Sequence, residues 1–342
     1  MTAPRRGRTA ALTAGLALFA AACAEDAPQD FLNHPVGRNA ESADRLWDLT
    51  FLVAAVIFFL VEAALVYALV RFRHRPGREA ADFHGNTRLE VVLTLIPALI
   101  LVGIAIPTVS TIFRLAGKPA NPLEVKVIGH QFWWEYQYDT NADGRADLVT
   151  ANEMHIPTDR AVFLIIEGAT DDVIHSFWVP RLSGKQDVVP GRPASMTLRT
   201  DEPGVYLGQC TEFCGLSHAN MRLRVVAQTP DEFDAWVAEQ QAPAELPASG
   251  PAAAGAQEFL TGACVECHTV AGTEAQGRVG PNLTHFASRS TFAGATFRVS
   301  DEEQLRAWLR DPPGEKPGVR MPNLGLSEQQ INDLVAFLYT LE

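Results

Sequence analysis

The sequence predicts a multidomain membrane protein with a two-helix transmembrane hairpin, an all-β domain and an all-α domain, in that order. Three observations support this prediction. Two apolar stretches precede residue 117, short β-rich runs fill residues 118–239, and helical patterns follow a Pro/Ala-rich stretch at 240–255. Each apolar stretch exceeds the ~20 residues that a bilayer requires. Short runs separated by Gly, Pro and Asp turns are typical of a sandwich or barrel.

Composition and charge narrow the possible functions. The chain has 342 residues, 47% of them hydrophobic, and a formal net charge of −12. This composition excludes wholesale disorder, and the negative charge argues against nucleic acid as a partner. The excess of acidic residues lies in the last two thirds of the chain, where it would steer a basic protein partner toward the surface.

Residues 1–23 have the features of an export signal. Arg5, Arg6 and Arg8 precede an apolar run over 10–22 that is too short to span a bilayer. The small residues before Cys23 leave two alternatives, which are lipid attachment at this cysteine and ordinary cleavage after an alanine. Either one predicts that the mature protein works outside the cytoplasm.

The transmembrane hairpin is expected over 40–117, with helices at about 48–70 and 91–113. The loop between the helices is rich in arginine, and the positive-inside rule therefore puts it in the cytoplasm. Both chain ends then face outward, in agreement with the export signal. Glu62 lies within the first apolar stretch, where a charge should face another protein. The hairpin therefore predicts a partner within the membrane.

The stretch "QCTEFCGLSHANM" places Cys210, Cys214, His218 and Met221 close together after a β-rich run. A disulfide is possible in an oxidising compartment, and zinc accepts Cys and His. Neither alternative uses the methionine, whereas copper binds thioethers. Two thiolates could bridge two copper ions, and each ion then needs an imidazole. His175, in "VIHSFW", is the candidate for the second one.

Together with "GHQFWWEYQY" and "DDVIHSFWVP", this motif resembles the CuA domain of cytochrome c oxidase subunit II. The resemblance covers residues 40–239 and implies a cupredoxin barrel at 118–239. The implied ligands of a binuclear copper centre are His175, Cys210, the backbone carbonyl of Glu212, Cys214, His218 and Met221. In this family the Glu212 carboxylate also reaches a magnesium ion shared with subunit I.

The same resemblance assigns roles outside the copper motif. Glu90 matches an acid at the mouth of a proton channel into subunit I, although an acid that merely marks the helix end is the alternative. Phe132, Trp133 and Trp134 match the aromatic stretch on the electron path. Most of the family has tryptophan where this chain has Phe132, so the indole N–H is lost at that position.

Residues 240–255 form a Pro/Ala-rich linker. We expect this linker to be a random coil and to act as a flexible tether. Beyond it, "CVECH" contains Cys264, Cys267 and His268. A zinc half-site or a redox dithiol lacks the required context, whereas C-x-x-C-H is the attachment motif of c-type haem. Residues 256–342 resemble a class I cytochrome c, with His268 and Met321 as axial ligands of the iron.

The domain order resembles subunit II of a caa-type cytochrome c oxidase. This resemblance implies a bacterial cytoplasmic (inner) membrane protein that crosses the membrane more than once, with the copper and haem domains on the outer side. The implied cofactors are CuA, covalent haem c and magnesium. The implied partners are oxidase subunit I, other oxidase subunits and a cytochrome c, with no role for nucleic acid. The alternatives are a CuA subunit of a nitric oxide reductase and a copper-delivery module.

Overall fold

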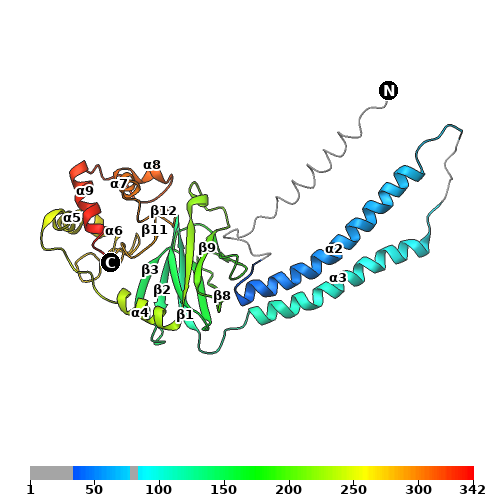
Figure 1. Ribbon diagram of the computed structural model, residues 1–342, viewed down its shortest axis with the longest axis horizontal. Coiled ribbons are helices and arrows are strands. Elements are labelled where there is room, and N and C mark those ends of the chain that lie inside the picture. Colours follow the sequence, from blue (N-terminus) through cyan, green and yellow to red (C-terminus); the bar gives the residue numbers. More distant parts are fainter. Residues whose placement is uncertain (1–33, 78–83) are drawn as a thin grey trace, which may run out of the picture.

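The computed structural model describes residues 34–77 and 84–342, arranged as three parts in chain order (Figure 1). Two long helices lie side by side at one end, two β-sheets occupy the middle, and a helical domain lies on the far side of the sheets. The predicted export signal with Cys23, and part of the loop within the hairpin, lie outside the described residues.

The hairpin consists of α2 (Arg38–Arg71) and α3 (Thr87–Leu115), both long and apolar enough to cross a membrane. Most of their large apolar side chains are exposed, as expected for surfaces that face lipid or another subunit. The Asn86 side chain accepts a hydrogen bond from Leu89 N at 3.2 Å and caps α3. Glu62 is exposed on α2, so a protein neighbour for this residue stays a prediction.

Helix α2 begins about ten residues before the predicted span because the β domain binds its first turn. The Asn39 amide donates to Thr197 O at 2.6 Å, and Ala40 N donates to Leu182 O at 3.4 Å. The second bond satisfies a backbone N–H that a helix terminus leaves without an intrahelical partner, and the first fixes the same turn to β8 (Ala194–Leu198). Hydropathy predicts only the apolar part of this helix and does not predict the polar turns that precede it.

The β domain is a sandwich of two five-stranded sheets. Their strand orders are β3-β2-β1-β5-β8 and β4-β10-β9-β6-β7. The strands are β1 Leu123–His130, β2 Trp133–Asp139, β3 Leu148–Ala151, β4 Glu153–Pro157, β5 Val162–Gly168, β6 His175–Trp178, β7 Lys185–Val188, β8 Ala194–Leu198, β9 Gly204–Cys210 and β10 Arg222–Gln228. Helix α4 (Pro230–Gln240) follows the last strand and adds Phe233 and Trp236 to the core.

Alternating burial along the strands builds the core of this sandwich. In β1 every second residue from Leu123 is buried, and in β2 the buried positions are Trp134, Tyr136 and Tyr138. This period of two places one face of each strand in the core. The large aromatic side chains therefore fill the space between the sheets and support the loops at its end.

The C-terminal domain is mainly helical, with one short β-ribbon. It contains α5 Gly250–Thr261, α6 Cys264–Cys267, α7 Glu302–Arg310, α8 Pro312–Glu315, α9 Glu328–Leu338, β11 Thr291–Phe292 and β12 Phe297–Arg298. Helices α5 and α9 pack at close range, since a Cβ atom at Gly255 would lie 1.9 Å from Asp333 O. Phe259 and Phe337 contact each other in the core between these helices.

The linker differs from the flexible tether predicted over 240–255. Helix α5 begins at Gly250, because a proline in its first turn and a run of alanines favour helix there. Upstream of α5, Ala244 N donates to Ala271 O at 2.9 Å, and the His285 ring nitrogen Nε2 lies 3.1 Å from Ala242 O. The connection therefore lies along the helical domain.

The α5–α9 contact yields the first prediction. Gly255→Ala should lower the melting temperature of the helical domain by roughly 5 to 20 °C, because the added methyl group overpacks the contact with Asp333. Differential scanning calorimetry of the full chain measures this transition. Gln257→Ala, at an exposed position of the same helix, is the control. Equal melting temperatures for the two variants would contradict the prediction.

Candidate metal centres

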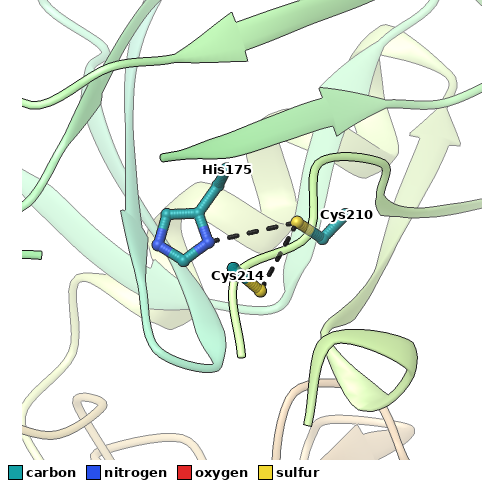
Figure 2. Close-up of side chains that lie close together, drawn as sticks. All are labelled: His175, Cys210 and Cys214. Carbon is teal, nitrogen blue, oxygen red and sulfur yellow. Dashed lines mark hydrogen bonds between the residues drawn. The ribbon is translucent and has the colours of Figure 1, made fainter. Parts of the chain in front are cut away.

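The loop between β9 and β10 gathers the soft ligands at one end of the sandwich. Cys210 ends β9, Met221 immediately precedes β10, and Cys210 N donates to Met221 O at 2.9 Å. This backbone bond closes the loop at its base. His175 starts β6 in the same sheet and points toward Cys210 and Cys214 (Figure 2).

The ligand atoms converge without a covalent bond between them. Cys210 Sγ lies 3.8 Å from Cys214 Sγ and 4.0 Å from His175 Nδ1. On the other side, Cys214 Sγ lies 3.6 Å from His218 Nδ1 and 3.8 Å from Met221 Sδ. The Glu212 carbonyl oxygen is 3.2 Å from Cys210 Sγ. Both cysteines are free thiols, so the structure contains a cluster here and not the disulfide alternative.

The electrostatics of the site favour a thiolate. Hydrogen bonds with Cys214 and His175 outweigh the opposing effect of burial and lower the pKa of Cys210 to about 3, while the same contact with Cys210 raises the pKa of Cys214. Thiolate is the form that binds metal. Both sulfurs and the His175 ring are buried, so a bound metal would be shielded from water.

Asp172, to which the sequence analysis gave no role, holds His175 in place. Its carboxylate oxygen Oδ1 lies 3.3 Å from His175 Nε2, which leaves Nδ1 directed at the sulfurs. Burial raises the pKa of Asp172, but hydrogen bonds from His175, Val173 N and Gln131 N outweigh it and lower the pKa to about 2. The signal available in the sequence was an acid three residues before the candidate histidine.

The donor set fits a pair of copper ions. Two cysteine sulfurs, two imidazole nitrogens, one thioether and one carbonyl oxygen lie around one small volume. Three of these residues, His175, Cys210 and Cys214, have ligand atoms that all lie within 4.8 Å of one another. A thioether within a thiolate and imidazole set favours copper over zinc. The fit supports the predicted ligands, which stay a prediction until metal is measured.

The three aromatic residues predicted on the electron path have different surroundings. Trp134 is buried, and its ring lies 6.0 Å from the His175 ring, edge to face. Trp133 stacks on His130 with ring centroids 4.2 Å apart. Phe132 is only 2% exposed, and its ring faces Gly318 of the helical domain, where an added Cβ atom would lie 3.3 Å from Phe132 Cε2.

The helical domain presents the groups that covalent haem requires. Cys264 and Cys267 are free thiols on α6, followed directly by His268. The His268 Nδ1 lies 2.8 Å from Pro281 O, so it donates its proton there and leaves Nε2 for an iron ion. Burial lowers the pKa of His268, which keeps the ring neutral. Met321 is partly buried against the same core. These residues fit a c-type haem.

Two predicted carboxylates lie outside these clusters. Glu90 is exposed in the first turn of α3, at the end of the hairpin far from the sandwich (Figure 1). The Glu212 side chain is exposed beside the copper ligands, so its carboxylate is free to meet a partner. The structure therefore separates the expected proton role from the metal centres.

Comparisons with known proteins agree with this architecture. The family described as cytochrome C oxidase subunit II, transmembrane domain, matches residues 31–111, and the periplasmic domain of that subunit matches 141–228. The cytochrome c family matches residues 252–342. All three matches follow the order of the hairpin, the sandwich and the helical domain.

Similar proteins named cytochrome c oxidase subunit 2 cover most of the chain. The protein from Alkalihalophilus pseudofirmus is 38% identical over 86% of this chain and 85% of its own length. The proteins from Bacillus sp. (strain PS3) and Bacillus subtilis are 34% and 32% identical. They cover 79% and 88% of this chain, and 80% and 90% of their own lengths.

The fold and the two sites define a membrane-anchored electron carrier with a copper-binding β domain and a haem-binding domain. Within that class, the chain belongs to the cytochrome c oxidase subunit II family, in the form with a C-terminal cytochrome c domain. The predicted family and fold class are confirmed. The matched domains imply CuA and haem c as cofactors. The two candidate spans and the match to a periplasmic domain support a membrane protein with an outer domain.

Asp172 yields the second prediction. Asp172→Asn should weaken copper binding about 10- to 100-fold, because the amide no longer fixes the His175 ring as a carboxylate does. Copper titration of the full chain against a competing chelator measures the affinity. Asp171→Asn is the matched control, since Asp171 is exposed beside it and asparagine tolerates its left-handed backbone. Unchanged affinity in Asp172→Asn would show that the carboxylate does not orient the ligand.

Proposed function

We propose that this chain is the electron-accepting subunit of a haem-copper oxidase. Haem c held at Cys264 and Cys267 would accept electrons from an external cytochrome c, and CuA would pass them on to haem a in subunit I. There, oxygen is reduced to water with proton pumping. The observation that carries the proposal is the presence in one chain of both a buried soft-ligand cluster and a haem attachment motif. The names of the relatives favour the oxidase over a nitric oxide reductase.

The proposed copper ligands are His175, Cys210, Glu212 O, Cys214, His218 and Met221. Bound copper would supply one-electron chemistry. The protein contributes a rigid frame: β9 and β10 hold the loop ends together, and the Trp134 ring packs against His175. Because Cys210, Cys214, Met221 and His175 are buried and held by this frame, little has to rearrange between the two redox states. Such a site transfers electrons and binds no substrate.

In the helical domain, Cys264 and Cys267 attach the haem, and His268 and Met321 hold its iron. The haem would supply one-electron chemistry at a potential that the methionine raises. The hydrogen bond to Pro281 O orients the His268 ring and leaves Nε2 available to an iron ion. Gly280 leaves room for this ring, since a Cβ atom there would lie 2.6 Å from His268 Cε1.

We assign the surroundings of the chain by the same reasoning. The partners are oxidase subunit I, other oxidase subunits and a soluble or membrane-bound cytochrome c. Glu62 faces one of the subunits, and the Glu212 carboxylate meets a magnesium ion at the border with subunit I. The chain crosses the bacterial cytoplasmic membrane twice after loss of residues 1–23, and Cys23 is a possible lipid attachment site.

Metal content tests the copper and haem assignment. The full chain should contain two copper ions and one covalent haem iron. Cys214→Ser should reduce copper to one or fewer per iron, because one of the two sulfur ligands is lost, while the Ala219→Ser control in the same loop keeps two. Elemental analysis with electron paramagnetic resonance measures both. One copper per iron, or zinc, in the unaltered chain would refute a binuclear centre.

Glu90 provides a separate test of the proton assignment. Glu90→Gln should slow turnover of the assembled oxidase several-fold, because an amide cannot pass protons at the mouth of the channel. Reduction of CuA in the same sample should keep its normal rate, since Glu90 is remote from the copper loop, the segment 211–221 between β9 and β10. Stopped-flow spectroscopy with a pH indicator records both events. Slowed copper reduction with normal proton uptake would reject the assignment.

A further inference from the structure

The helical domain lies against the copper loop through a set of direct hydrogen bonds. Arg222 N donates to Gly294 O, and Thr296 Oγ1 donates to Asn220 O, each at 2.9 Å. On the other side of His218, Ser217 Oγ donates to Pro317 O at 2.6 Å. Bonds on both sides of a predicted copper ligand place the helical domain directly over the loop.

Lys316 is the most deeply buried charged residue in this contact, with 2% of its surface exposed. Its ammonium donates to Phe132 O at 2.7 Å and to Ala293 O at 2.8 Å. One acceptor belongs to the β domain and the other to the helical domain. Burial lowers the pKa of Lys316 to about 7. A buried amine is costly unless it is hydrogen-bonded, so Lys316 requires these two acceptors. Separation of the domains would remove one of them.

A second buried charge ties the domains at β4. Glu153 is only 5% exposed, and its carboxylate accepts hydrogen bonds from Ser290 N at 3.0 Å, Ser290 Oγ at 2.5 Å and Thr291 Oγ1 at 2.5 Å. These donors all belong to the helical domain. A buried carboxylate with its donors across the contact is stable only while the domains are together.

The docked segment also contains the residue before the predicted haem ligand Met321. The Arg320 guanidinium lies 3.4 Å from Asp172 Oδ2, and the other oxygen of that carboxylate holds His175. The same segment covers Phe132, because Gly318 packs against its ring. In this arrangement, an external protein cannot reach the Phe132 side of the copper loop.

We propose that Lys316 is a latch that holds the cytochrome c domain on the copper loop, so that the two centres exchange electrons within one preformed complex. This proposal rests on the proposed function for the electron step only. The latch itself is a positioning residue and touches neither predicted centre. Because the latched domain covers Phe132, the haem c of this chain replaces an external donor at that position.

Hydrogen exchange tests the latch without any electron transfer. The amides of Arg222 and Ser290 bond across the contact, so their exchange reports separation of the domains. In the full chain, Lys316→Met should speed both about 10- to 100-fold, as expected for the loss of a charged donor. The amide of His268, bonded within the helical domain to Cys264 O, should not change. Lys185→Met, at an exposed lysine, is the matched control.

Two further variants keep the test decisive if Lys316→Met fails to fold. Lys316→Gln retains a donor and should accelerate Arg222 exchange less than methionine does. Glu153→Gln disturbs the contact from its other side and should also accelerate exchange at Arg222. If the Lys316 variants keep haem, exchange of the Arg222 amide at the unaltered rate in them would overturn the latch. If they lose haem, the unaltered rate in Glu153→Gln would overturn it.

Electron transfer in the assembled oxidase gives the second readout. After flash reduction of haem c, the unaltered complex should reduce CuA in one phase that does not depend on solvent viscosity. Lys316→Met should add a slower, viscosity-dependent phase, while copper content, haem content and the copper spectrum stay unchanged. If Lys316→Met keeps the single viscosity-independent phase, the latch is rejected. If the unaltered chain lacks binuclear copper, the proposed function fails and the exchange experiment still decides on the latch.

Discussion

The backbone hydrogen bond between Cys210 N and Met221 O is the constraint on which the copper cluster depends. Four of the predicted side-chain ligands lie between these two residues or at them. A loop that carries them can converge on one point only if its ends are held together. The pairing of β9 with β10 continues this closure into the sheet, so the rigidity of the sandwich extends to the ligands.

Local chemistry in the sequence was enough to predict the cluster and the haem motif. Cys210, Cys214, His218 and Met221 are close in the chain, so their spacing alone indicated a shared site. His175 is distant in sequence, and it was found because a second imidazole was needed. Asp172 was missed because the role of an acid depends on the ring atom that it faces, which spacing does not reveal.

The relation between the domains was beyond the reach of sequence patterns. A Pro/Ala-rich linker predicted a flexible connection, yet the structure seats the helical domain on the copper loop through Lys316 and Glu153. Each of these charges resembles an ordinary surface residue in the sequence. Their burial follows from the complementary shapes of two folded domains, and such shapes exist only after folding. The first turn of α2 was misjudged for the same reason, since the β domain supplies its partners.

The continuity of α2 has a consequence for how the outer domains stand above the membrane. The helix runs unbroken from its apolar span to the turn in which Asn39 binds the β domain. A helix turns by about 100° and rises 1.5 Å per residue. One inserted residue between the span and that turn would therefore change the orientation of the copper loop relative to the other subunits of the complex. The number of residues between the span and the Asn39 turn therefore sets both the height and the rotation of the β domain above the membrane.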